Sequence, residues 1–206
     1  VIRLSLSPDG RTLASTGLSD APSVKLWDVA AGQPIREFAT ELPTGQFFRD
    51  VAFDGNGRAV AALTSRATVH LWDAATGEAW PTYSGRRADN LCSFALKPAG
   101  GVGAFGSADG TLALWDTTSA AEIRTIPAHD GAVYAVAFRP DGRAIATAGS
   151  DGFVRIWSTE TGQKLRESRV GPRLGRVHQL AFAPDGRHLS TANGNGTAYV
   201  LRLPAE

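Results

Sequence analysis

A tryptophan recurs along this chain at an almost constant interval, and this feature limits the possible folds more than any other. The intervals are 45, 43 and 42 residues, and the tryptophans are Trp27, Trp72, Trp115 and Trp157. A second marker, a turn of the Pro-Asp-Gly type, keeps the same period. It occurs at residues 8–10, 55–57, 98–100, 140–142 and 184–186. Two markers with a single period predict an array of structural repeats.

The clearest copy, residues 129–168, predicts four short strands joined by turns. Pro140-Asp141-Gly142 has the composition of a tight turn, and Asp151-Gly152 is typical of a two-residue hairpin. The apolar and β-branched runs between these turns predict strands at residues 133–138, 144–148, 153–157 and 164–168. Strands at such short intervals leave no room for crossover helices, so we expect an all-β chain.

Trp-Asp, Pro-Asp-Gly and Asp-Gly at this period resemble the WD40 repeats, which form the blades of β-propellers. The resemblance covers residues 1–206 as a single region and implies a WD40-type β-propeller with five four-stranded blade repeats. The repeats span residues 1–43, 44–86, 87–128, 129–172 and 173–206, and we expect the last one to lack its outer strand.

The family usually has seven blades and closes its ring by pairing an N-terminal outer strand with the last blade. Here the chain opens in an inner strand, residues 1–6, and ends after a third strand, residues 199–203. We therefore expect a C-terminal fragment of a propeller with seven or more blades, and a ring of five blades is the alternative. The ending resembles WD40 arrays of large bacterial multidomain proteins.

The resemblance also implies a structural hydrogen-bond tetrad of His, Ser or Thr, Asp and Trp within each blade. The fourth copy has all four residues: His129, Thr147, Asp151 and Trp157. The other copies are incomplete. The first copy keeps Ser15, Asp20 and Trp27. The second has Thr44, Ala62 and Arg66 where His, Ser or Thr and Asp are expected, and the third has Arg87 and Phe105 but keeps Asp109 and Trp115. The fifth has Arg173 and Asn195, with Leu201 in place of Trp.

By analogy with the family, the protein-binding residues lie early in each inner strand and just before the hairpin aspartate. The candidate face consists of Phe47, Arg49, Ser65, Asn90, Cys92, Tyr134, Ser150, Arg176 and His178. Phe47, Arg49 and Tyr134 are of types enriched at binding hot spots. The alternative is that these side chains merely line loops and the central channel.

Two further motifs have ordinary explanations. Residues 164–176 contain five basic residues and one acid, which suits an acidic or phosphorylated segment but equally a solvated outer strand. Residues 101–106 match the dinucleotide pattern GxGxxG, yet they lie in a predicted second strand and no helix follows.

Composition excludes several classes of function. The net charge of +1 gives no strong field for nucleic acid, and no apolar run reaches the length of about 20 residues that spans a membrane. Cys92 is the single cysteine, which excludes a disulfide framework and a multi-cysteine zinc site. Of the histidines, His129 is explained by the tetrad and His70 by an outward position on a third strand. We therefore expect no metal, no cofactor and no catalytic residues.

These observations favour a cytoplasmic, non-catalytic scaffold that docks peptides or domains on the loop-bearing face of a propeller. A catalytic domain on the same parent chain is a further candidate partner. The alternative is a substrate-docking or regulatory propeller of a larger signalling enzyme, such as a Ser/Thr kinase fusion. A third interpretation is purely structural, with contacts through blade edges.

Overall fold

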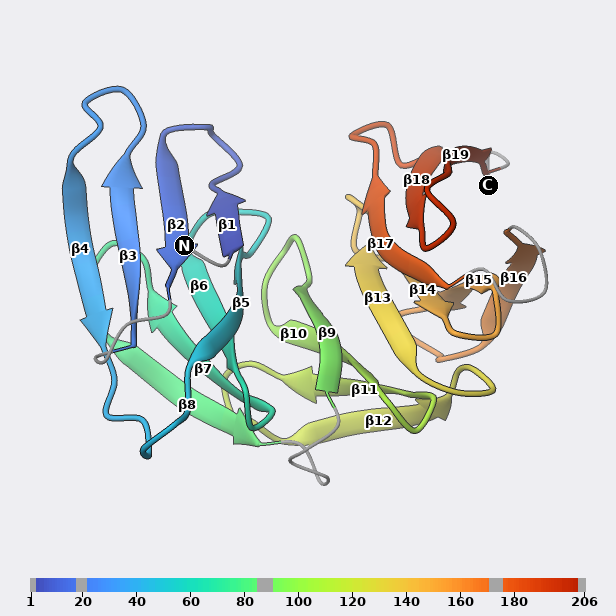
Figure 1. Ribbon diagram of the computed structural model, residues 1–206, viewed down its shortest axis with the longest axis horizontal. Helices are drawn as coiled ribbons and strands as arrows, with labels where there is room; N and C mark the ends of the chain where they lie inside the picture. The colour runs from blue at the N-terminus through green and yellow to red at the C-terminus, as the bar shows by residue number, and fades with distance from the viewer. Residues whose placement is uncertain (1–2, 18–21, 85–90, 171–175, 204–206) are drawn as a thin grey trace. The chain divides into compact units, whose positions relative to one another are not determined.

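The computed structural model describes residues 3–17, 22–84, 91–170 and 176–203, and every regular element among them is a β-strand (Figure 1). The strands form five antiparallel sheets in which neighbours in sequence are neighbours in space. The first sheet contains β1 (Arg3–Leu6), β2 (Thr12–Thr16), β3 (Ser23–Asp28) and β4 (Pro34–Ala39). The second contains β5 (Phe48–Phe53), β6 (Ala59–Thr64), β7 (Thr68–Asp73) and β8 (Ala79–Ser84).

The remaining sheets repeat this order. The third contains β9 (Leu91–Leu96), β10 (Val102–Ser107), β11 (Thr111–Asp116) and β12 (Glu122–Pro127). The fourth contains β13 (Val133–Phe138), β14 (Ala144–Gly149), β15 (Phe153–Ser158) and β16 (Lys164–Arg169). The fifth has three strands, β17 (Val177–Phe182), β18 (His188–Asn193) and β19 (Ala198–Arg202). The prediction of an all-β fold built from four-stranded blades is thus confirmed.

Local sequence accounts for the turns within a blade. Gly142 has a φ of 68° and Gly152 a φ of 78°, conformations that glycine adopts without a steric penalty. The Asp141 carboxylate accepts a hydrogen bond from the Arg143 backbone N–H at 2.9 Å and so closes the turn between β13 and β14. Turns of this kind depend on residues two or three apart, which is why the sequence pattern predicted them.

The chain separates into two compact units. The first comprises Val1–Asp89, Ala99–Gly101 and Thr117–Ala121, and the second comprises Asn90–Pro98, Val102–Asp116 and Glu122–Glu206. In the first unit, one face of the β1–β4 blade packs on one face of the β5–β8 blade. The rings of Phe38 and Trp72 stack there with centroids 5.0 Å apart. The expectation of a single propeller region stays a prediction.

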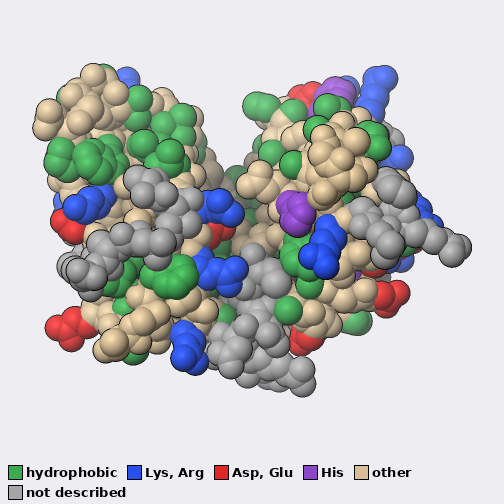
Figure 2. Space-filling model, in the orientation of Figure 1, with side chains coloured by type: hydrophobic (Ala, Val, Ile, Leu, Met, Phe, Trp, Pro, Cys, Tyr) green, Lys and Arg blue, Asp and Glu red, His purple; other side chains and the backbone are tan. Residues whose placement is uncertain are grey.

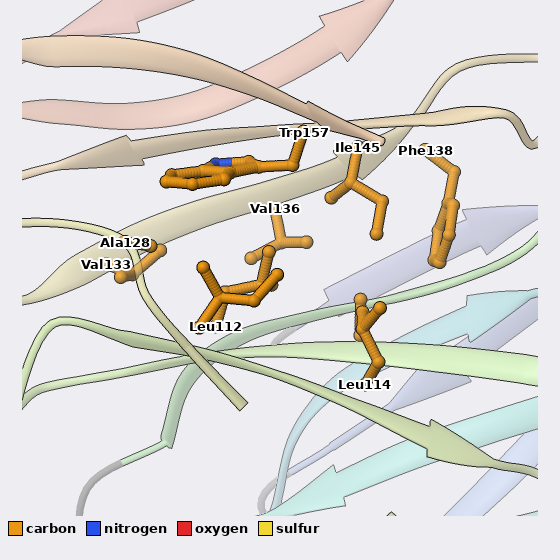
Figure 3. Packing of buried hydrophobic residues seen from close by; sticks show 10 residues of the cluster. Leu112, Leu114, Ala128, Val133, Val136, Phe138, Ile145 and Trp157 are labelled. Atoms are coloured by element: carbon orange, nitrogen blue, oxygen red, sulfur yellow. The ribbon is translucent and has the colours of Figure 1, made fainter. Parts of the chain in front are cut away.

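The second unit has two successive layers of the same kind. Leu112 and Leu114 of β11 face Val136, Ile145 and Trp157 of the next blade (Figure 3). The opposite face of that blade, made of small residues such as Ala146 and Ala148, packs against the β17–β19 sheet. Full burial of a leucine side chain stabilises a fold by about 1.5–3 kcal/mol, so these layers hold neighbouring blades together.

Candidate functional site

The innermost strands of four blades each carry one extra residue near their start. In β13, Val133 pairs with Gly149 and Ala135 pairs with Ala148, which leaves Tyr134 without a partner across the ladder. The same shift of register occurs in β5, β9 and β17. The extra residues are Arg49, Cys92, Tyr134 and His178. A β-bulge of this kind redirects a side chain, and all four residues belong to the predicted face.

Hydrogen bonds connect the two kinds of predicted position within a blade, the start of the inner strand and the residue just before the hairpin. The Ser65 N–H donates to the Phe47 carbonyl at 2.8 Å, and the Phe47 N–H donates to Ser65 Oγ at 3.3 Å. Ser150 N–H donates to the Ala132 carbonyl at 2.8 Å. These bonds hold the start of the inner strand beside the end of the second strand, so both present their side chains at one end of the blade.

In the first unit, the candidate site consists of Phe47, Arg49 and Ser65. Arg49 is exposed, whereas Phe47 and Ser65 are half-buried. The neighbouring Asp50 lies 3.9 Å from Arg3, and burial raises the pKa of the Asp50 carboxyl above its usual value. This part of the face therefore combines an exposed guanidinium with a partly buried aromatic ring.

In the second unit, Tyr134, Arg176 and His178 lie together. The Arg176 guanidinium stands over the Tyr134 ring, with Cζ 5.9 Å from the ring centroid. The His178 ring lies 5.8 Å from the same ring at an angle of 41°. Figure 2 shows His and Lys or Arg side chains side by side on this face of the β13–β19 part of the chain. Ser150 is half-buried at the end of β14 in the same unit.

The side chains of two residues of the predicted face are not described. Asn90 lies outside the described residues, and of Cys92 only the backbone position in β9 is described. In the basic stretch 164–176, Lys164 and Arg169 lie on β16, while residues 171–175 are outside the described part.

The four tetrad residues of the fourth blade form a continuous chain of hydrogen bonds. The Trp157 indole N–H donates to Thr147 Oγ1 at 2.8 Å, and the same hydroxyl is hydrogen-bonded to His129 Nε2, also at 2.8 Å. His129 Nδ1 lies 2.9 Å from Asp151 Oδ1. Thr147 is fully buried and Trp157 nearly so, and therefore each polar atom needs such a partner.

Arg155 and Glu167 extend this chain to the outer strand, which the sequence analysis missed. Arg155 Nη1 lies 2.6 Å from Asp151 Oδ2, and Arg155 Nε donates to Glu167 Oε2 at 2.6 Å. Burial opposes ionisation of Asp151, but hydrogen bonds from Arg155 and His129 outweigh it and hold the pKa of the Asp151 carboxyl below its usual value. The sequence did contain a signal for Arg155 as a neighbour of the tetrad. Arg155 stands two residues before Trp157 on the same strand, so both side chains lie on the same face of the sheet.

Other blades keep or replace single links of the tetrad. The first keeps the link between the indole and the hydroxyl, since the Trp27 N–H donates to Ser15 Oγ at 2.8 Å. In the third, Phe105 stands in place of the hydroxyl residue and stacks on Trp115, with ring centroids 5.4 Å apart. The predicted outward position of His70 is wrong. The His70 ring is half-buried and stacks on Trp72 at 5.9 Å, because residues two apart on a strand share a face. Burial lowers the pKa of His70.

No group of three or more His, Cys, Asp or Glu side chains in the described part of the chain is arranged to hold a metal ion. Nor does any described helix reach the length and apolarity needed to cross a membrane.

Comparison with known proteins agrees with this geometry. A family model described as WD domain, G-beta repeat matches residues 1–28 and 120–158. The second match includes the whole tetrad of the fourth blade. These matches support the WD40 repeat family. WD40 repeats generally mediate protein–protein interactions.

A mouse protein, Telomerase protein component 1 (Mus musculus), is 32% identical over 142 residues. The aligned region is 69% of this chain and 5% of the mouse protein, so the chain spans a small part of the length of this relative.

Proposed function

We propose that this chain is a non-catalytic interaction scaffold that docks peptides or domains on the blade ends formed by the bulged inner strands. The observation that carries the proposal is the repeated bulge at Arg49, Cys92, Tyr134 and His178. In these four blades a bulged first strand pairs with the second strand in the same way, whereas the side chain at the bulge differs from blade to blade. A rigid frame that presents varied side chains is suited to recognition.

The WD40 family and the mouse relative are compatible with this role. That relative is named as a protein component of telomerase, which makes it part of an assembly. The residue types at the bulges and beside them also fit, because Tyr and Arg are enriched in binding hot spots.

The test compares partner capture by the full chain with capture by two triple variants. In the face variant, Arg49, Tyr134 and Arg176 are changed to alanine. The control variant also changes two arginines and one tyrosine to alanine, but at exposed positions outside the proposed face: Arg166, Arg187 and Tyr199. Partners are captured from the native cell and quantified by mass spectrometry for each variant.

We expect the face variant to lose its partners and the control variant to keep them. If the face variant retains every partner at full yield, the proposed face is wrong. Loss of partners in the control variant alone would instead favour the interpretation in which contacts are made through blade edges and outer strands, because Arg166 lies on β16 and Tyr199 on β19.

A further inference from the structure

We propose that Tyr134, Arg176 and His178 form a binding site for one oxyanion, the carboxylate or phosphate group of an acidic or phosphorylated side chain on the docked partner. This inference rests on the proposed function, since the anion belongs to a partner protein. It adds the chemistry that this part of the face recognises.

A cation–π contact with Tyr134 places the Arg176 guanidinium beside this ring. Arg176 Cζ lies over the ring, 5.9 Å from its centroid, which is within the range of such an interaction. A guanidinium carries five N–H donors at its edges, in a fork that matches carboxylate and phosphate oxygens. The ring attracts the cation but supplies no anion for these donors.

His178 supplies a second nitrogen donor next to the same ring. The centroid of the His178 ring lies 5.8 Å from the centroid of the Tyr134 ring. Tyr134 lies on β13 and His178 on β17 of the neighbouring blade. Tyr134 and His178 are both bulge residues, and therefore the backbone register sets the direction in which each side chain leaves its strand.

The backbone of the fifth sheet is adapted to this arrangement. The Gly194 N–H donates to the Arg176 carbonyl at 2.7 Å and so holds the residue before β17. Ser65 and Ser150 occupy the corresponding position in two other blades. A Cβ at Gly194 would lie 2.9 Å from His178 Nε2, so the glycine provides the space in which the imidazole ring lies.

Among the described residues, the acidic side chains of this unit that form ion pairs do so with cations other than Arg176. Asp151 is paired with Arg155, and Glu167 is paired with Arg155 and Lys164. Arg176 forms an ion pair with none of the acidic residues that the structure describes, including the exposed Asp130 before β13. An anion from outside the chain would therefore meet a cation that has no ion-pair partner among the described residues.

The size of the cluster fits a single anionic group and disfavours a nucleic-acid backbone. Recognition of a polyanion depends on many Lys and Arg contacts and a strongly basic surface. The chain has a net charge of +1, and one guanidinium in this cluster is matched to one oxyanion.

The test is an NMR titration of the isotope-labelled full chain with sodium phosphate and, separately, with sodium acetate, at constant ionic strength set with sodium chloride. The signals observed are the Arg176 Nε–Hε group and the His178 and Gly194 amides. We expect saturable shifts of these signals with phosphate, acetate or both. Saturation by acetate would indicate a carboxylate ligand, and saturation by phosphate alone a phosphorylated one.

Three variants locate the effect. Arg176→Gln should weaken anion binding at least tenfold, whereas Arg187→Gln, an exposed arginine of the same sheet, should leave it unchanged. Tyr134→Leu should weaken it severalfold because the guanidinium loses its ring, and Tyr134→Phe should weaken it less. Gly194→Ala should also weaken binding, because the added methyl group displaces the His178 ring without removing a charge.

Absence of saturation with both anions, or an equal loss in Arg176→Gln and Arg187→Gln, would overturn the oxyanion site. Partner capture separates this result from a failure of the proposed function. If Arg49→Ala abolishes capture while neither anion binds, the scaffold function stands and the oxyanion site is wrong. If anions bind but Arg176→Gln captures every partner fully, the anion is not part of the docked protein and the inference is also overturned.

Discussion

Gly103 lies directly beneath the indole ring of Trp115, its partner across the β10–β11 ladder. A β-carbon on residue 103 would overlap the ring itself. Gly106, three residues further on, would place a β-carbon 2.6 Å from Val133 Cγ1. Close packing therefore explains two glycines of the GxGxxG pattern at residues 101–106, and the pattern lies on a β-strand with no helix after it.

Gly103→Ala should destabilise the third blade. The methyl group and the fully buried Trp115 ring cannot occupy the same space, and overpacking of this kind costs about 1–3 kcal/mol of unfolding free energy. Chemical denaturation followed by tryptophan fluorescence measures the loss. Ile123→Ala, at a half-exposed position of the same sheet, serves as a control and should change stability by no more than about 0.5 kcal/mol.

Thr147→Val should be much more damaging than the same change at Thr191. Valine keeps the shape of threonine but leaves the Trp157 N–H and His129 Nε2 without their partner, at a cost of about 2–3 kcal/mol. Thr191 lies 44 residues further on, is 3% exposed, and its hydroxyl bonds to none of the described residues. Thr191→Val should therefore be neutral or slightly stabilising in the same denaturation experiment. Equal losses would show that the hydrogen-bond chain contributes nothing specific.

Stability should fall as the pH is lowered through the range where histidine titrates. Burial lowers the pKa of His129 below its ordinary value of 6.5, so the unfolded chain binds the proton first. The contribution of neutral His129 to the unfolding free energy is fully present above pH 6.5. It is lost as the pH falls towards the pKa of His129 in the folded chain. His70, whose pKa is also lowered by burial, acts in the same direction.

The measurement is the unfolding free energy between pH 8 and pH 5 for the native chain and for His129→Gln and His70→Gln. Each variant should show a flatter dependence on pH than the native chain, because one lowered pKa has been removed. A His129→Gln curve parallel to that of the native chain would contradict the role assigned to His129.

Ala120→Gly should stabilise the chain. Ala120 has a φ of 56°, while glycine stands five residues after the tryptophan in three other repeats, as Gly32, Gly77 and Gly162. A left-handed conformation costs a residue with a β-carbon about 1–2 kcal/mol, and the greater freedom of glycine in the unfolded chain offsets part of the gain. We expect a net gain of about 0.5–1 kcal/mol in thermal or chemical unfolding. Gly162→Ala is the reciprocal variant and should be destabilising.

Strands and turns could be predicted from sequence because their signals act over short distances along the chain. Asp151-Gly152 specifies a hairpin, and Pro140-Asp141-Gly142 a turn, whatever the rest of the chain does. The four residues of the tetrad could be named because the resemblance to WD40 repeats implies set positions for them relative to these turns. Arg155 and Glu167 were missed because the interaction between them depends on the pairing of β15 with β16.

The repeat alone, with its turns and its alternating apolar residues, determines that this chain forms antiparallel blades. The contact of Tyr134 with Arg176 and His178 was decided by tertiary structure, since these residues are more than 40 positions apart and belong to different sheets. The same is true of the bulge that redirects Tyr134, which exists only in the register between β13 and β14. Periodicity is a local property of the chain, whereas register and side-chain contacts between blades depend on how whole sheets pack.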